Sequence, residues 1–319
     1  MAIISYQDIS ALRDRINTEL SQRPIGETML CADFCWFRPG QGGRERFELD
    51  ALGCDADYYN ELEQVNTTPP EAVEFQVEHK EFGMKPFRNI PKYTTMTDVY
   101  GILDRNLPEI AAHSMQYYDP TVAKALGLGQ STLCAFDNLS YFNTLHLVNP
   151  NRPWLGTFPN LFAGTALNRA GLIRGFNALT QMKNFAGQKL NMPGRLAVLV
   201  GNEDQYNRAA TELNSEIVAA AIGAAAASQS NSLKGRADII LVPQLDDFDG
   251  GKAWYIAKMA SGQHRGITFS EVMKPTIMIE GLSPTDHLHV ILHTVLYGWR
   301  SCWGVGYLWP QLMVKLIEP

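Results

Sequence analysis

The sequence has few of the features that mark nucleic-acid-binding, secreted or membrane-spanning proteins. It contains no run of Lys or Arg longer than two residues, and its net charge is −6, so the basic face that nucleic-acid binding requires is missing. No apolar stretch reaches the roughly 18 to 20 residues of a membrane span, and the nearest, residues 217–227, is too short. The first twenty residues lack a basic segment followed by an apolar run, so we expect no signal peptide.

Cysteine is also sparse. The five thiols are scattered, are odd in number and form no CxxC pair; they are Cys31, Cys35, Cys54, Cys134 and Cys302. This usage predicts reduced, buried thiols rather than a disulfide framework. Cys31 and Cys35 are four residues apart but lack the second pair that a structural zinc site needs.

Motifs of common enzyme classes are missing as well. There is no GxSxG and no Cys–His pattern typical of a nucleophile. The glycine-rich RPGQGGRER (38–46) lacks the GK[ST] ending of a phosphate loop and is predicted to be a flexible turn. The segment LDDFDGG (245–251) lacks the distal glutamate of a calcium loop, so a hairpin turn is favoured. We therefore predict no catalytic, cofactor-binding or metal-ligating residue, and no enzymatic activity.

Three histidines near the C-terminus form the sharpest alternative. In a strand His287, His289 and His293 would share one face, because their spacings are even. His293 would then lie about 20 Å from His287 at roughly 3.3 Å per residue, so the three cannot bind one metal in a regular strand. A polar strand face is the favoured interpretation. A metal-dependent hydrolase using His287 and His289 is the alternative from another functional class.

What is present is enough apolar sequence for a sizeable core, since 45% of the 319 residues are hydrophobic. A short helix is predicted at 6–20, and the rest of 1–74 is punctuated by Gly, Pro and Asn, as expected of an extended arm. From Phe75 the sequence alternates, with Phe75, Val77 and His79 on one face, which predicts a half-exposed strand opening a projecting hairpin.

Helices and strands then follow without regular βαβ alternation, which predicts an α+β protein. A helix over 97–115 is predicted to kink at Pro108, and a second piece is predicted at 121–126. Thr165 is expected to cap the next helix, and Asn202–Ser215 to form another. The predicted strands after residue 190 are 195–201, 237–242, 253–257, 275–280 and a strand-like block at 287–317.

Several segments, in this order, resemble one known family. They are RNIPKYTTMTDVYG (88–101), AFDNLSYFNTLHLVNP (135–150), NSLKGRADIILVPQLDD followed by AWYIA (231–257), MKPTIMIE (273–280) and YGWRSCWGVGYLWPQLM (297–313). The chain resembles the major head subunit of Mu-type tailed bacteriophages, which has the Hong-Kong-97-type phage capsid fold. The resemblance runs from about residue 75 to the C-terminus, with a small-residue stretch at 219–232 of this chain's own.

The resemblance implies a division of the chain into capsid segments. These are an N-terminal arm (1–74), an extended hairpin loop (75–96), a peripheral domain with a long spine helix (97–130), an axial domain (131–270) and peripheral return strands that can re-enter the axial domain (271–319). The tail tryptophans Trp299, Trp303 and Trp309 would then lie on strands covered by the spine helix and by neighbouring subunits.

The resemblance also implies a function. The chain would be a major capsid protein that self-assembles into pentamers and hexamers of an icosahedral head enclosing double-stranded DNA, without sequence-specific contact and without a cofactor. Its other partners would be a portal, a scaffold or maturation protease and decoration proteins. It would be assembled in the host bacterial cytoplasm and reside in the virion. An encapsulin-like cellular nanocompartment with the same fold is the alternative.

Overall fold

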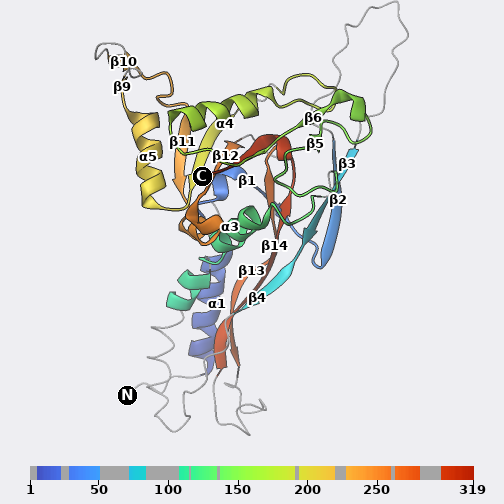
Figure 1. Cartoon of the computed structure of the whole chain (residues 1–319). Helices are drawn as coiled ribbons and strands as arrows, with labels where there is room; N and C mark the ends of the chain where they lie inside the picture. The colour runs from blue at the N-terminus through green and yellow to red at the C-terminus, as the bar shows by residue number, and fades with distance from the viewer. Residues whose placement is uncertain are drawn as a thin grey trace, which may run out of the picture.

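The computed structural model describes most of the chain. The described residues are 6–22, 29–50, 72–83, 108–114, 116–134, 137–190, 194–219, 228–259, 263–280 and 296–319. Figure 1 shows a body that contains two sheets, and a long strand pair that extends from it beside an N-terminal helix. Among the helices within these ranges, none is long and apolar enough to span a bilayer.

The larger sheet has six strands and joins distant parts of the chain. Its strands are β1 (Cys35–Pro39), β2 (Arg44–Asp50), β3 (Ala72–Glu78), β4 (Lys80–Gly83), β13 (Ile267–Glu280) and β14 (Leu296–Tyr307). The order is β1-β13-β14-β3-β2, and β4 also pairs with β14. The β1–β13 pair is parallel, and the other pairs are antiparallel.

Part of the predicted N-terminal arm belongs to this sheet. The sequence predicted little regular structure between the first helix and residue 74, but β1 and β2 are regular strands there. The partner of β1 is β13, more than two hundred residues later in the chain, so no local periodicity announces the pairing. The expectation of an irregular segment is wrong for 35–39 and 44–50.

The smaller sheet has five strands in the order β11-β8-β12-β15-β7. They are β7 (Leu161–Phe162), β8 (Arg195–Val200), β11 (Ala237–Leu241), β12 (Ala253–Met259) and β15 (Met313–Ile317). β11 and β12 lie on opposite sides of β8. The hairpin predicted at 245–251 is therefore wrong. The chain crosses over β8 there through two short 3-10 turns, η4 (Pro243–Asp247) and η5 (Asp249–Gly251).

The helices largely follow their predicted positions. They are α1 (Tyr6–Gln22), a helical stretch at 108–114, α3 (Tyr118–Leu128), α4 (Arg169–Gln181) and α5 (Glu203–Asn214). Asn202 caps α5 by accepting from the Gln205 amide. The predicted cap Thr165 is wrong, because Asn168 caps α4 instead. The Thr165 amide donates to the Ile317 carbonyl, which ties Thr165 to the end of β15.

Two further features place these helices. The kink expected at Pro108 depends on residues 97–107, which lie outside the described residues. The described part of this helix begins at Pro108. Leu12, Ile16 and Leu20 of α1 are spaced by four and are buried, as expected of one helix face, and α1 packs on β13.

One hydrophobic core runs through both sheets. Its largest fully buried side chains are Trp254, Trp303, Trp309, Tyr118, Tyr141 and Tyr255. Two of the three tail tryptophans are therefore completely covered within a single copy of the chain. The part of the earlier expectation that required neighbouring subunits to cover them is unnecessary.

Candidate functional site

The extended strand pair leaves the body at a junction where the sheet narrows. We call this region the arm junction, and we call β4 with the outer parts of β13 and β14 the arm (Figure 1). The arm junction contains two sets of side chains, which we call the polar group and the aromatic group. Its residues are Arg38, Glu45, His79 and Ser270, together with Phe82, Tyr118, Phe269, Trp299 and Trp303.

The alternation predicted for this strand is present. Phe75, Val77 and His79 are buried, whereas Glu78 and Lys80 are exposed. β3 and β4 keep one register with β14, which pairs Gly306 with Val77 and Trp303 with Lys80. β3 and β4 therefore follow one another along β14. β3 pairs with both β14 and β2, whereas β4 pairs with β14 alone, and the change occurs at His79, next to the residue that pairs with the start of β2.

Two glycines of β14 allow β3 to lie this close. A Cβ atom on Gly304 would lie 2.5 Å from the Glu78 carbonyl oxygen. A Cβ atom on Gly306 would lie 2.5 Å from a methyl carbon of Val77. Real Cβ atoms do not approach other heavy atoms so closely, so the WGVGY segment of the tail requires glycine at both positions.

The polar group fastens the β1–β2 turn to the start of the arm. The His79 ring is completely buried, with Nε2 2.8 Å from the Ser270 hydroxyl and Nδ1 3.0 Å from the Gly43 carbonyl. Glu45 pairs with Arg38 and lies 3.7 Å from His79. Buried charges are tolerated when they are paired and hydrogen-bonded in this way.

This arrangement corrects the expectation of a flexible turn at 38–46. Gly42 and Gly43 adopt φ of 92° and 65°, a region that favours glycine. The Gln41 amide donates to the Glu45 carboxylate, and the Arg38–Glu45 pair closes the turn. The turn is therefore held by its own side chains, and its glycines serve backbone geometry rather than phosphate binding.

The aromatic group is centred on Trp303. Its ring stacks on Phe82 of β4 at 4.3 Å and 9°, and meets the edge of Tyr118 from α3 at 4.7 Å and 88°. Trp299 and Phe269 complete the cluster at 6.2 and 6.3 Å. Offset and edge-to-face pairs of this kind add to the stabilisation from burial. Trp303 thus connects the arm, the tail strand and α3.

Hydrogen bonds add three more links between α3 and the strand pair. Tyr118 donates to Glu271 at 2.5 Å, the Trp303 indole donates to Thr121 at 3.3 Å, and Tyr307 donates to the Ala125 carbonyl at 2.6 Å.

Burial is the largest cause of the altered pKa values at these links. It raises the pKa of Tyr118 far above its usual range, with the Glu271 charge adding to the effect. Burial likewise raises the pKa of Glu271, while the bond from Tyr118 opposes this. Burial raises the pKa of Tyr307 to about 12. The two phenols therefore remain donors at neutral pH.

A second polar pair lies in the stretch that carries the family resemblance. The His146 ring lies 2.6 Å from the Asp137 carboxylate through Nδ1 and 3.0 Å from the Tyr141 carbonyl through Nε2, and both side chains are fully buried. Both ring nitrogens thus face acceptors, so the pair holds the loop together and offers no open position to a substrate. The pair therefore has a structural role in this loop.

The residues considered for metal binding in the sequence lie in two segments, 287–293 and 245–251. His287, His289 and His293 lie outside the described residues. Within 245–251, Asp249 pairs with Lys315 at 2.6 Å and Asp246 accepts from Asn202 at 2.7 Å, so these carboxylates already have partners. Across the ranges that the structure describes, no group of three His, Cys, Asp or Glu is arranged to hold a metal ion.

The cysteines do not form a reactive or metal-binding pair. Cys31 and Cys35 are buried thiols without a disulfide, and burial raises the pKa of each. Cys54 lies outside the described residues.

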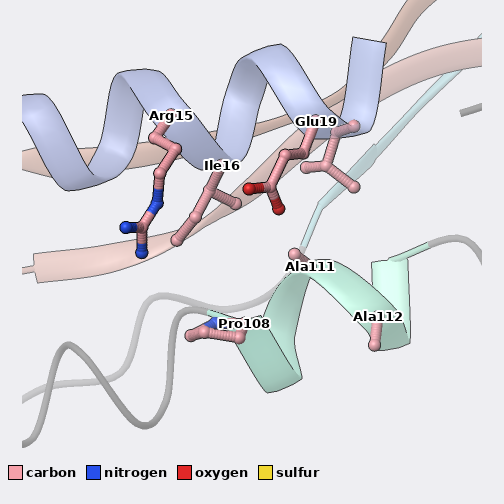
Figure 2. Close-up of a pocket in the computed structure, with 7 residues that line it drawn as sticks. Arg15, Ile16, Glu19, Pro108, Ala111 and Ala112 are labelled. Carbon is pink, nitrogen blue, oxygen red and sulfur yellow. The ribbon is translucent and has the colours of Figure 1, made fainter. Parts of the chain in front are cut away.

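A groove between α1 and residues 108–114 is too small for an ordinary ligand. Its volume is about 90 Å³, against the roughly 300–1,000 Å³ of small-molecule pockets. Ile16 of α1 faces Pro108 and Ala111 across it, and Arg15 and Glu19 extend toward it from α1 (Figure 2). It is a packing defect between two helices rather than a substrate site.

Sequence reasoning did not find most residues of the arm junction. The alternation indicated that His79 is buried, but nothing local indicated Arg38, Glu45 or Ser270 as its neighbours. The tail tryptophans were noticed for their number, and the resemblance to a known family implied a helix as their cover. Tyr118 of α3, the helix predicted at 121–126, contacts Trp303. The helix predicted over 97–115 lies mostly outside the described residues, so cover by the spine helix stays a prediction.

No protein-family profile matches the sequence, and no curated protein matches it. Solved structures do match its fold. The procapsid of bacteriophage JBD30 aligns with a TM-score of 0.53 at 16% identity, covering 99% of this chain and 77% of that one. The capsid of the same phage aligns at 0.51 and 11%, covering 98% and 73%. The capsid of cyanophage Pam1 aligns at 0.53 and 12%, covering 93% of both chains.

These similarities confirm the predicted fold class. The chain has the α+β, Hong-Kong-97-type fold of phage capsid proteins. Each of these neighbours is a phage capsid or procapsid protein. The narrower resemblance to Mu-type head subunits stays a prediction.

Proposed function

We propose that this chain is the major capsid protein of a tailed bacteriophage, and that it assembles into pentamers and hexamers of an icosahedral head around double-stranded DNA. The observation that carries the proposal is the extent of the match to the Pam1 capsid, which covers 93% of each chain. A match over nearly the full length of both chains supports a capsid role for this chain. We therefore propose a structural role rather than a catalytic one.

The geometry of the arm supports this role. The strand pair extends beyond the body and is supported along its length by α1, which packs on β13, so its direction depends on α1 and on its base. The arm junction supplies that base through Trp303, Phe82 and the buried His79. A rigid arm can cover a neighbouring subunit, and many such weak contacts add up in a closed shell.

The proposed division of the chain keeps its predicted segments. They are the N-terminal arm at 1–74, which is distinct from the arm defined above, an extended loop at 75–96, a peripheral domain at 97–130 and 271–319, and an axial domain at 131–270. The pairing of β15 with β12 supports a tail that re-enters the axial domain. The pairing of β1 with β13 supports counting part of the first segment with the peripheral sheet.

The remaining parts of the proposal concern the particle. The net charge of −6 favours a shell interior that does not trap DNA by gripping its phosphates. We propose assembly in the host cytoplasm, with a portal, a scaffold or maturation protease and decoration proteins as partners, and a closer relation to Mu-type head subunits than to other capsid proteins.

The test is electron microscopy of negatively stained purified protein, together with light scattering. Closed shells, or rings of five and six subunits, are the expected result. A stable monomer or dimer at high concentration, even with a scaffold supplied, refutes the proposal. Shells that copurify with a cargo enzyme instead of DNA would indicate a cellular nanocompartment.

A matched pair of variants tests the role of the arm. Phe82 and Phe37 are both partly buried aromatic residues of the larger sheet, but only Phe82 lies on the arm. We expect Phe82→Ala to give a several-fold lower yield of shells than Phe37→Ala gives. Equal yields would show that the arm does not contribute to assembly.

A further inference from the structure

Open strand edges are points where another chain can add a strand, and proteins usually protect them. In the part of this chain that the structure describes, two outer strands are protected by their own sequence. β2 has a charged residue at five of its seven positions, RERFELD. β7 is only two residues long. Neither strand is suited to bind another chain.

Two other edges are protected by side chains. Along β1, Arg265 donates to the Cys35 carbonyl, and Pro39 has no amide hydrogen to offer. Along β13, Asn17 of α1 accepts from the Ile277 amide at 2.7 Å and donates to the Ile277 carbonyl at 3.2 Å. The Asn17 amide thus takes the place of a neighbouring strand.

β11 lacks every one of these protections. It pairs with β8 on one side, and no described strand pairs with its other side. Its sequence ADIIL has no proline, no lysine and a single charge, Asp238, which is half exposed. Ile239, Ile240 and Leu241 are only partly buried. An apolar edge of this kind is an interaction site or an aggregation hazard.

A second incomplete element follows α5 in the chain. β9 (Ile217–Ala219) and β10 (Ser228–Ser230) form a two-stranded hairpin, and no described strand pairs with either outer edge. The six paired residues include no charge and no proline. An isolated two-stranded hairpin is at best marginally stable in water, and a third strand or packing against a helix stabilises it.

The base of the hairpin is anchored to the end of α5. The Asn231 side chain donates to the carbonyls of Glu212 and Ser215, at 2.6 and 2.9 Å. Lys234 pairs with Glu216 at 2.8 Å. Figure 1 shows β9 and β10 beyond the end of α5, away from the edge of the smaller sheet. The hairpin is therefore held in a position where a different molecule can meet it.

We propose that the β9–β10 hairpin of one copy adds to the open β11 edge of a second copy. Every copy carries one hairpin and one edge, so the contact is head-to-tail, and such contacts form closed rings when the rotation closes. In a ring of five or six, each β11 edge is covered and each hairpin gains its third strand. The inference rests on the proposed capsid function and deepens it, because it names the contact that joins neighbours within a ring.

Paired cysteines test this contact. One variant carries Asp238→Cys together with Ser230→Cys, and sister variants place the second cysteine at Ser228 or Gln229. After treatment with a short thiol crosslinker, we expect covalent ladders that stop at five or six subunits. A mixture of the two single variants, Asp238→Cys and Ser230→Cys, should give only dimers. The parent protein, with its native cysteines, is the control and should give no ladder.

The position dependence distinguishes strand pairing from a loose encounter. Side chains of a strand alternate between its faces, so crosslinking should be strong at two hairpin positions of one parity and weak between them. Uniform crosslinking at Ser228, Gln229 and Ser230 would overturn strand addition. Dimers without a ladder from the double variant would indicate a symmetric contact and would also overturn it.

Assembly supplies an independent readout. We expect the double variant Val218→Pro and Gln229→Pro to retain its helical circular dichroism but to form at least tenfold fewer rings or shells. Val218→Thr with Gln229→Thr keeps the amide donors and should assemble normally. Shells that form normally from the proline variant, and without crosslinks from the cysteine variants, refute this contact and leave the capsid function standing. Absence of shells from the parent protein refutes both.

Discussion

Replacing Trp303 by alanine is the most direct test of the arm junction. Trp303 is completely buried, and its ring contacts Phe82, Tyr118 and Trp299. These partners come from β4, from the residues that begin α3 and from β14 itself. Removing the ring therefore leaves a cavity at the point where the arm meets the body.

The expected loss of stability follows from the buried area. A fully buried tryptophan removes about 150–250 Å² from water, which at roughly 25 cal/mol per Å² corresponds to about 4–6 kcal/mol. Measured Trp→Ala and Phe→Ala changes in protein cores cost about 3–5 kcal/mol. We therefore expect Trp303→Ala to lower the free energy of unfolding by about 4 kcal/mol.

Urea unfolding followed by tryptophan fluorescence and circular dichroism measures this loss. The matched control is Trp154→Ala, because the Trp154 side chain is 76% exposed and should cost less than about 0.5 kcal/mol. Hydrogen exchange should also accelerate in β4 for Trp303→Ala and stay unchanged for Trp154→Ala. A loss below about 1.5 kcal/mol for Trp303→Ala, or equal losses for the two variants, would refute the role assigned to the cluster.

Three further changes probe other contacts. Asp249→Asn should cost about 2 to 3 kcal/mol, because it leaves the buried Lys315 ammonium without its ion partner. Burial lowers the pKa of Lys315, and the nearby Asp249 carboxylate opposes this lowering. Without that carboxylate the folded state of the variant binds fewer protons than the unfolded state at alkaline pH. The free energy of unfolding of the variant should therefore rise as the pH is raised toward the pKa of Lys315 in the unfolded chain. Asn17→Ala should cost about 1 to 2 kcal/mol and speed exchange of the Ile277 amide. Gly306→Ala should cost about 1 to 3 kcal/mol through overpacking.

Each of these changes has a matched control. Asp247→Asn alters an exposed aspartate of the same crossover and should leave the pH profile of unfolding unchanged. Asp14→Ala alters an exposed residue of α1 and should leave the Ile277 amide protected. Gly43→Ala should be tested beside Gly306→Ala, because nothing lies near its added Cβ and any cost comes from its φ of 65° alone. For the two polar changes, a variant that behaves like its control would contradict the contact assigned to it. For the glycine pair, a Gly306→Ala cost below about 0.5 kcal/mol would contradict the close approach of β3.

Local patterns in the sequence were sufficient for elements whose partners lie nearby. The period of two at Phe75, Val77 and His79 predicted the buried face of β3 because alternation records burial directly. The helix predicted over Asn202–Ser215 is α5, and its local prediction succeeded because a helix end is determined by the few residues around it, here the acids of its first turn. The Thr165 prediction failed because a distant partner, the Ile317 carbonyl, engaged its backbone.

The sequence by itself determined the α+β class, the positions of most helices and the strand alternation, and the order of its motifs carried the resemblance to a capsid fold. Only the tertiary structure decided what meets at the arm junction. The stacking of Phe82 on Trp303, the pairing of β1 with β13 and the open edge of β11 depend on chain segments far apart in sequence. Such contacts form because removing apolar surface from water is favourable whichever segments provide it, and the topology decides which segments meet. A short stretch of sequence therefore does not show which partner it will contact.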